Sequence, residues 1–315
     1  RQKSLYILVR APRRPINSIH AIPSILEMRR ILLLLDISSI LCAFSCAFSL
    51  PPPISPSLPS SSTSSPVSAA AVLYKLKANE DSQMYSEALN LSSRGNYLAA
   101  KRLLSQLVKN EPNFVNGHSL LGNTYTAVGE LGLADDEYSN AIDLCLSDSN
   151  GSRCKDLWLS YVNRGCVRLN SGAVQESLSD FNRAASLRSK PELTIATNRA
   201  RALEILGDFP GADSDYEVAV QLSGSEIAPF WLRSALVKYE QNDVGGAHRR
   251  LARVEQRFGE APEVLVAKAI IDGDGVSLSK LPESQRLLFR DESYLKETLK
   301  WGPRMTTAVK ALKNL

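Results

Sequence analysis

The stretch NRGCVRLNSGAVQESLSDFNRA, residues 163–184, has a counterpart in NRARALEILGDFPGADSDYEVA, residues 198–219. Both begin with Asn-Arg, carry a Gly nine residues further on, and place an aromatic residue three positions before a closing Ala. The two stretches start 35 residues apart, a spacing typical of a repeated structural unit. The shared letters therefore mark either a chemical site that is used twice or a packing unit that is used many times.

The same layout occurs five times along the chain. The units start near Asp81, Val115, Trp158, Leu193 and Ala228. The steps between them are 34, 43, 35 and 35 residues, and the long step contains an insertion, LSDSNGSRC, at residues 146–154. Each unit has two amphipathic stretches on either side of a turn, which predicts a pair of helices.

Fixed offsets inside each unit predict how its two helices pack. A small residue in the first helix lets the second helix approach closely, at Ala88, Gly122, Gly165, Ala200 and Ala235. A large residue in the second helix fills the remaining space, at Leu104, Tyr138, Phe181, Tyr216 and Leu251. These offsets follow the helical period of 3.6 residues and so share one face. Arg164 and Arg199 adjoin the small position, and we interpret them as structural.

This order of residues, small–Tyr/Leu–Gly–Ala–aromatic–Ala–Pro, resembles the tetratricopeptide repeat family. The best match is LGNTYTAVGELGLADDEYSNAI, residues 121–142. The resemblance runs from about Asp81 to Pro262 and implies an all-α, right-handed α-solenoid of about five helix-turn-helix repeats. The second unit departs from the pattern because it lacks a closing Pro, and the fifth has Asn242 where a turn Gly is usual.

The chain divides into three parts. Residues 1–79 are a targeting leader with a Pro/Ser-rich linker, residues 80–262 are the repeat superhelix, and residues 263–315 are a helical cap. A stack of helical pairs leaves its last apolar face open, so it needs an atypical end. Helices are predicted over residues 283–289, 292–300 and 303–312. The cap would be built from Leu287, Leu288, Phe289, Leu295, Leu299, Trp301, Met305 and Val309.

The basic charge of the chain sits in the leader. Residues 1–79 hold nine Lys or Arg against two acids, whereas the remaining residues hold 28 basic and 31 acidic groups. The body therefore gives no electrostatic case for a nucleic-acid partner. The chain begins at Arg1, and Met28 is a candidate start. A basic, hydroxyl-rich and acid-poor leader is typical of a chloroplast transit peptide.

Two other interpretations of the leader remain open. A secretory signal would use Ile31–Phe48 as its apolar core and be cleaved near Ser49. A membrane anchor over Ile31–Leu50 is long enough to span, but Asp36 argues against it because a charge in hydrocarbon is costly. Membrane association is expected only through this leader. The run Pro51–Pro66 cannot bury a core, so we expect it to be disordered.

No catalytic or cofactor motif emerges from the sequence. His20, His118 and His248 are far apart in register, no Cys or His spacing suits zinc, and no Gly-rich phosphate loop occurs. We therefore predict no enzyme, no metal, no cofactor and no small-molecule substrate. Cys145 and Cys154 bracket the insertion, where they are either a loop clasp in an oxidising compartment or free thiols, and the sequence favours free thiols.

The resemblance also implies where a partner would bind. In the family, the fifth, sixth, ninth and twelfth residues of each unit line the concave face; we call these the inner positions. The polar and aromatic candidates at the inner positions are Tyr85, Asn123, Asn163, Asn198, Arg201, Arg233 and Tyr239. Amide and guanidinium groups on a rigid surface pair with the main chain and carboxylates of a peptide. A protein or peptide is thus the expected partner.

For one activity of the family, the residues that perform it can be compared with this sequence. Members that grip the carboxyl terminus of chaperones use a Lys/Asn/Asn/Lys/Arg clamp, and Asn123 and Asn163 match its two Asn positions. Ser119 and Thr194 stand at the Lys positions, and Asn198 replaces the Arg, so the clamp is incomplete. We expect a chloroplast adaptor or assembly factor. The alternatives are an adaptor in the secretory pathway or endoplasmic reticulum lumen, and a co-chaperone or an enzyme with its activity in the tail.

Overall fold

A computed structural model describes residues 69–147, 154, 156–223, 228–273 and 275–312. The predictions made for Met28, Ile31–Leu50 and Pro51–Pro66 lie outside the described residues. Among the described residues the secondary structure is helical, with no strand. No helix in these ranges combines the length and the apolar character that a membrane crossing needs.

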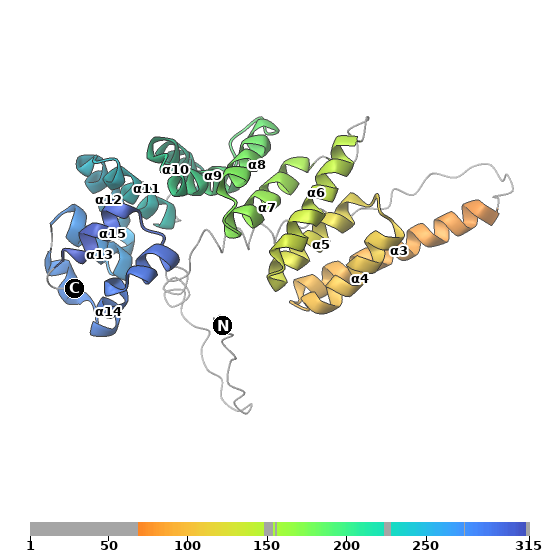
Figure 1. Cartoon of the computed structure of the whole chain (residues 1–315), viewed down its shortest axis with the longest axis horizontal. Coiled ribbons are helices and arrows are strands. Elements are labelled where there is room, and N and C mark those ends of the chain that lie inside the picture. Colours follow the sequence, from red (N-terminus) through yellow and green to blue (C-terminus); the bar gives the residue numbers. More distant parts are fainter. Residues whose placement is uncertain (1–68, 148–153, 155, 224–227, 274, 313–315) are drawn as a thin grey trace, which may run out of the picture.

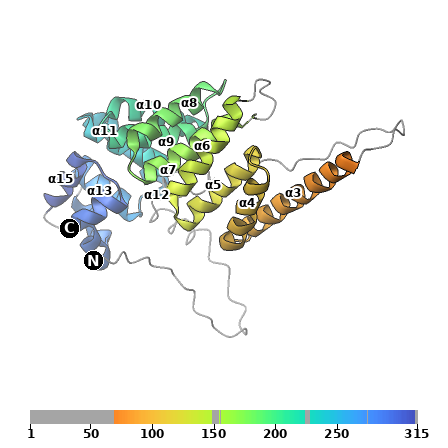
Figure 2. The same ribbon diagram turned by 45° about the vertical axis from the view of Figure 1, so that its right-hand side comes forward.

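The helices follow one another in antiparallel pairs along a curved path (Figures 1 and 2). Their bounds in the repeat region are α3 Ala69–Ser93, α4 Tyr97–Asn110, α5 Val115–Val128, α6 Leu131–Ser147, α7 Leu157–Asn170, α8 Val174–Ser186, α9 Leu193–Ile205, α10 Phe209–Ser223, α11 Ala228–Glu240 and α12 Val244–Phe258. Each odd-numbered helix packs on the even-numbered helix that follows it, which completes one repeat. Each even-numbered helix then packs on the first helix of the next unit. The predicted α-solenoid is confirmed. Helix α3 begins upstream of the expected boundary at residue 80.

The turns between paired helices need a left-handed backbone. Gly95, Gly129, Gly172 and Gly207 each have φ between 77° and 87°. Glycine reaches this region without steric cost, which is why it ends the first helix of four units. In the fifth unit Asn242 takes the same conformation, with φ 67°. Asn tolerates the left-handed region better than most residues other than glycine. The turn therefore survives the departure from the repeat pattern.

The small residues of the first helices are required by close contact. A Cβ added at Gly165 would lie 2.6 Å from Cε1 of Phe181, and one added at Gly122 would lie 2.8 Å from Cε1 of Tyr138. Phe181 and Tyr138 are both fully buried. The predicted pairing of a small residue with a large one is confirmed at these two units.

In the middle of the array, salt bridges join the two helices of one repeat, first α7 to α8 and then α9 to α10. Arg164 on α7 donates to both carboxylate oxygens of Asp180 on α8, at 3.0 and 2.7 Å. One unit later Arg199 on α9 donates to both oxygens of Asp215 on α10, each at 2.6 Å. The two aspartates are buried. The structural interpretation of Arg164 and Arg199 is confirmed.

The C-terminal part closes the last repeat with irregular helices. They are α13 Pro262–Ile271, the 3-10 helix η1 Gly275–Lys280, α14 Glu283–Arg290, the π-helix η2 Tyr294–Thr298 and α15 Pro303–Lys310. Six of the eight predicted cap residues join the core of α11–α13: Phe289, Leu295, Leu299, Trp301, Met305 and Val309. Leu287 and Leu288 do not, since they are 54% and 45% exposed. Their prediction was wrong because α14 buries only Phe289 among its residues.

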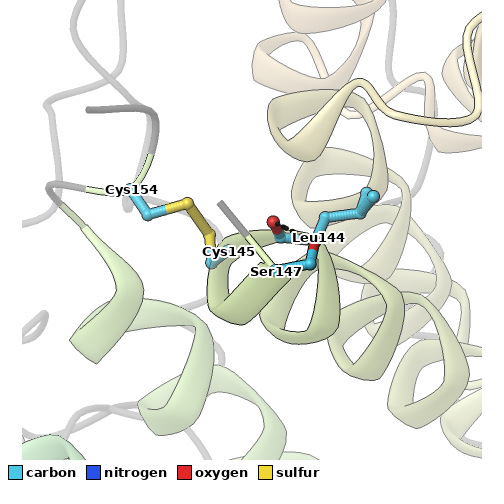
Figure 3. Close-up of a disulfide and its surroundings, with 4 residues drawn as sticks. All are labelled: Leu144, Cys145, Ser147 and Cys154. Carbon is cyan, nitrogen blue, oxygen red and sulfur yellow. Dashed lines mark hydrogen bonds between the residues drawn. A yellow bond between two sulfur atoms is a disulfide. The ribbon is translucent and has the colours of Figure 1, made fainter. Parts of the chain in front are cut away.

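The insertion of the second unit carries a covalent link. Cys145, in the last turns of α6, forms a disulfide with Cys154 just before α7, and their Cα atoms are 5.5 Å apart (Figure 3). The preference for free thiols was therefore wrong. The error has a simple cause, because the spacing of two cysteines along the chain does not reveal the distance between their Cα atoms. Cys166, the remaining cysteine of the repeat region, is buried and is not part of a disulfide.

Candidate partner-binding surface

The two faces of the first helices differ in the contacts they make. Arg164 and Arg168 of α7 reach Asp180 on the second helix of their own repeat. Asn123 of α5 and Asn163 of α7, at inner positions, contact each other across neighbouring repeats. The inner positions therefore lie on the side of each first helix that meets the first helix of the neighbouring repeat. In a solenoid of paired helices, the row of first helices forms the extended concave surface.

An amide pair joins α5 to α7. The Oδ1 of Asn123 accepts from the hydroxyl of Tyr138 at 2.6 Å and from Nδ2 of Asn163 at 3.2 Å. Asn163 is only 3% exposed, and its own Oδ1 has no hydrogen-bond partner among the described residues. Asn123 is half-buried. The sequence thus predicts two amides that the fold brings together.

Tyr85 is placed mainly in the core. Its ring is 8% exposed and meets Phe114 edge to face, with the ring centroids 5.3 Å apart. The hydroxyl has no hydrogen-bond partner among the described residues, and burial raises the pKa of Tyr85 to about 12. Tyr85 therefore stiffens the first repeat and leaves one polar atom unsatisfied.

Asn198 is not part of the amide pair. It is 1% exposed, and its Nδ2 donates to the carbonyl of Thr194 at 2.9 Å within α9. A side chain that bonds its own helix in this way offers little to an external ligand. The line of asparagines suggested by the repeat spacing is thus limited to Asn123 and Asn163.

Arg201 of α9 and Arg233 of α11, both at inner positions, form a largely buried charged cluster with Glu204. Glu204 accepts from Arg233 at 3.1 Å, from Arg201 at 3.3 Å and from the hydroxyl of Tyr216 at 2.9 Å. Glu204 and Arg201 are 8% and 4% exposed. Burial, together with the charge of Glu204, raises the pKa of the Tyr216 hydroxyl. The cluster holds two cations and one anion, so it has a surplus positive charge that needs acceptors.

The tail supplies those acceptors. Arg233 donates to the carbonyl of Lys300 at 2.8 Å and to that of Leu299, and Arg201 approaches the Lys300 carbonyl at 3.5 Å. These two carbonyls come directly after η2, at its C-terminal end. The carbonyl groups at the C-terminal end of a helix attract cations. Lys300 has φ 54°, a left-handed conformation. Arg201 and Arg233 are therefore engaged by the chain itself.

A second anchor lies about two turns further along α11, at its C-terminal end. The carboxylate of Glu240 accepts from the backbone N–H of Arg304 at 3.1 Å and of Met305 at 2.8 Å, at the start of α15. The guanidinium of Arg304 lies 4.3 Å from the ring centroid of Tyr239 and donates to the Tyr239 carbonyl at 2.6 Å. Burial raises the pKa of Glu240 even though these N–H groups oppose it. Tyr239 is thus also engaged by the tail.

Sequence reasoning missed Glu204, Glu240 and the tail loop Leu299–Arg304. A signal for the acids was present, because each stands near the end of a first helix, and Glu204 follows Arg201 by three residues. Charges three apart share a helix face. No local pattern reveals the path of the loop. Among the described residues, no group of three His, Cys, Asp or Glu side chains is arranged to hold a metal ion.

The fold matches solved structures, two of which are titled as repeat proteins. YrrB, titled a TPR protein with an unusual peptide-binding site, aligns with TM-score 0.51 and 14% identity over 63% of this chain and 97% of its own. The C-terminal part of a TPR repeat-containing protein from Cytophaga hutchinsonii gives TM-score 0.54 and 15% identity over 73% and 95%. PilF of Pseudomonas aeruginosa gives TM-score 0.54 and 18% identity over 75% and 99%. The chain therefore has a tetratricopeptide-type solenoid fold.

At these identities the structural likeness concerns the fold alone. No family model matches the sequence, and the search of curated proteins found no match.

Proposed function

We propose that this chain is a non-catalytic protein-interaction scaffold that holds a peptide or a protein subunit on the inner positions of its first helices. The observation that carries the proposal is the Asn123–Asn163 pair, which spans two repeats and keeps one amide oxygen unpaired. Amides both donate and accept, so they suit the main chain of an extended segment. The likeness to a protein titled as having a peptide-binding site supports the same function.

The experiment is affinity capture with the full chain as bait, using isolated plastids as the source. We expect a partner that is retained by the parent and lost from the variant with Asn123→Ala and Asn163→Ala. Asn140→Ala is a matched control, because Asn140 is an exposed amide on the second helix α6. A partner that binds the double variant as well as the parent would contradict the proposal, provided that both proteins show the same thermal unfolding.

We propose the chloroplast as the compartment, with the chain acting as an adaptor or assembly factor there. The support is the composition of residues 1–79, which is basic and poor in acids. Cleavage near Ala69–Ala71 would leave nearly the whole of α3, which begins at Ala69. A fusion of residues 1–79 to a fluorescent protein tests the proposal by its location.

The secretory alternative is favoured by one observation, the Cys145–Cys154 disulfide. Disulfides persist in oxidising compartments and are rare where thiols are kept reduced. Amino-terminal sequencing of the mature protein separates the two routes, since signal cleavage is expected near Ser49 and transit cleavage near Ala69–Ala71. The other alternative, an activity in the tail, gains no support, because six of the eight large apolar residues considered for the cap are used in packing.

A further inference from the structure

A hollow of about 230 Å³ lies between the fourth and fifth repeats, bounded by the two second helices α10 and α12. Helix α11 packs on both of them and contributes the residues that lie between them (Figure 1). We call this hollow the outer groove, because none of its residues stands at an inner position. It is lined by Glu217, Val220, Gln221, Trp231, Ser234, Arg250 and Arg253.

Two arginines line the outer groove, and they differ in their partners. The guanidinium of Arg250 bonds to the carboxylates of Asp213 and Glu217 and to the hydroxyl of Ser234. Arg253 is exposed and makes no hydrogen bond or ion pair with any described residue. Arg250 therefore balances the acids that it meets, whereas Arg253 places a positive charge at the groove with no acid opposite it.

The groove also has apolar walls that a ligand can reach. Trp231 and Val220 are both half-buried, so part of each side chain remains accessible. One repeat earlier, the residues 35 positions before Trp231 and Arg253 are Ala196 and Val218. The packing of the fourth repeat is thus achieved without an aromatic ring or a guanidinium at these two positions. The combination in the fifth repeat is therefore not a requirement of the repeated fold.

We propose that the outer groove is a second docking site, which receives an Asp or Glu side chain of an acidic protein segment. The carboxylate pairs with the guanidinium of Arg253, whose N–H donors match a carboxylate in geometry and charge. The methylene part of the side chain lies against Trp231 and Val220 and leaves water there. The volume of the groove is below the roughly 300–1,000 Å³ of small-molecule pockets, so one inserted side chain fits it better than a cofactor does.

The surroundings favour a protein carboxylate over a nucleic acid. The Glu217 side chain, which lines the groove, is 54% exposed. Residues 80–315 hold 28 basic and 31 acidic groups, so the body does not attract a polyanion over a distance. A nucleic-acid strand brings a row of closely spaced phosphates, of which all but one would meet these acids. A single carboxylate reaches Arg253 without this repulsion.

The test uses the purified full chain and three capped peptides of equal length that share their apolar residues and carry a central pair of Glu, Gln or Lys. We expect the Glu peptide to bind more tightly than the other two and to weaken as the salt concentration rises. Arg253→Ala should weaken binding of the Glu peptide about tenfold, and Arg253→Glu should transfer the preference to the Lys peptide. Arg102→Ala is the matched control, because Arg102 is an exposed arginine on the second helix α4.

The Arg253 variants are expected to keep the unfolding temperature of the parent, since the side chain is exposed and bonds to no described residue. Equal binding of the Glu and Gln peptides, or undiminished binding by Arg253→Ala, would overturn the inference. Either result would leave the proposed scaffold function in place, because Asn123 and Asn163 do not line the groove. A single-stranded oligonucleotide that binds more tightly than the Glu peptide and is lost in Arg253→Ala would overturn the assignment to a protein carboxylate.

Discussion

At the scale of single residues, the contact between Gly165 and Phe181 shows what one methyl group can change. The alanines at the equivalent position of other units face Leu104, Tyr216 and Leu251 across the same helix pair, whereas Gly165 lets the Phe181 ring approach within the space of a Cβ. The type of the large side chain does not by itself decide between Gly and Ala, since Tyr138 meets Gly122 and Tyr216 meets Ala200; what matters is how closely the ring approaches the first helix. This dependence leads to a prediction of opposite signs for two glycines.

Gly165→Ala is expected to lower the free energy of unfolding by about 1–3 kcal/mol, because the added Cβ overpacks the contact with Phe181. Gly132→Ala is the matched control. It lies in α6, has nothing within 4 Å of an added Cβ, and should be neutral or stabilising by up to about 1 kcal/mol. Denaturant unfolding of the two variants measures the difference. A stabilised Gly165→Ala variant would show that the Phe181 ring moves freely.

Glu263 is a buried acid at the start of α13. It is 4% exposed, neither carboxylate oxygen bonds to another described residue, and burial raises its pKa to about 7. An acid whose pKa is raised by folding binds its proton more tightly in the folded state than in the unfolded state. The free energy of unfolding therefore falls as the pH rises from the ordinary Glu range to about 7.

Glu263→Gln should remove this dependence. Above pH 7 we expect the variant to be more stable than the parent by about 1–3 kcal/mol, and the gap should close toward the ordinary pKa of Glu. Unfolding curves recorded across this pH range provide the measurement. Glu260→Gln serves as control, because the Glu260 side chain is 75% exposed. A gap that stays constant with pH would mean that Glu263 does not titrate in this range.

At the scale of helices, salt bridges connect the repeats in two different ways. In the third and fourth repeats an Arg on the first helix binds an Asp on the second, as Arg199 binds Asp215. In the fifth repeat the Arg is on the second helix, where Arg250 binds Asp213 and Glu217 on the preceding second helix. The former link fixes a repeat internally, and the latter fixes one repeat to the next.

Arg199→Ala is expected to lower the free energy of unfolding by about 2–3 kcal/mol, because it leaves the buried carboxylate of Asp215 without its bidentate partner. Lys280→Ala breaks an exposed pair with Glu260 and should cost less than about 1 kcal/mol. Thermal and denaturant unfolding compare the two. Equal effects would indicate that the Arg199 pair contributes no more than a surface pair.

The repeat helices could be predicted from the sequence because their signals are local. The unit starts at Val115, Leu193 and Ala228 coincide with the first residues of α5, α9 and α11. The packing offsets recur in phase with the helical period, so each unit confirms the next. The C-terminal helices lack such repetition, and α14 therefore left Leu287 and Leu288 exposed against expectation.

The candidate site was predicted less completely than the fold. A register position indicates the face of a helix, and it correctly brought Asn123 and Asn163 together. It does not indicate what else reaches that face. Arg233 is held by a carbonyl 67 residues further along the chain, and a contact at this separation leaves no periodic trace in the sequence. The disulfide was missed for a different reason, because the spacing of its two cysteines along the chain does not reveal the distance between their Cα atoms.

At the scale of the whole molecule, the tail makes contacts with the fourth and fifth repeats. The described helices form one succession from α3 to α13, and α15 of the tail packs on α11 and α13 (Figure 1). Arg201 of α9 also approaches the carbonyl of Lys300 in the tail. The last two repeats therefore take part in the closure of the fold through Arg201, Arg233 and Glu240.

The same contacts restrict how an array of this kind can change its length during evolution. Repeat arrays change by the gain or loss of whole units. The loop Leu299–Arg304 binds Arg201 from one unit and Arg233 and Glu240 from the next, so these two units and the tail must be inherited as one block. A unit duplicated inside or after the block would separate its charges from the loop. Duplication before α9 leaves them in place, so a unit can be added without breaking these contacts only on the amino-terminal side of α9.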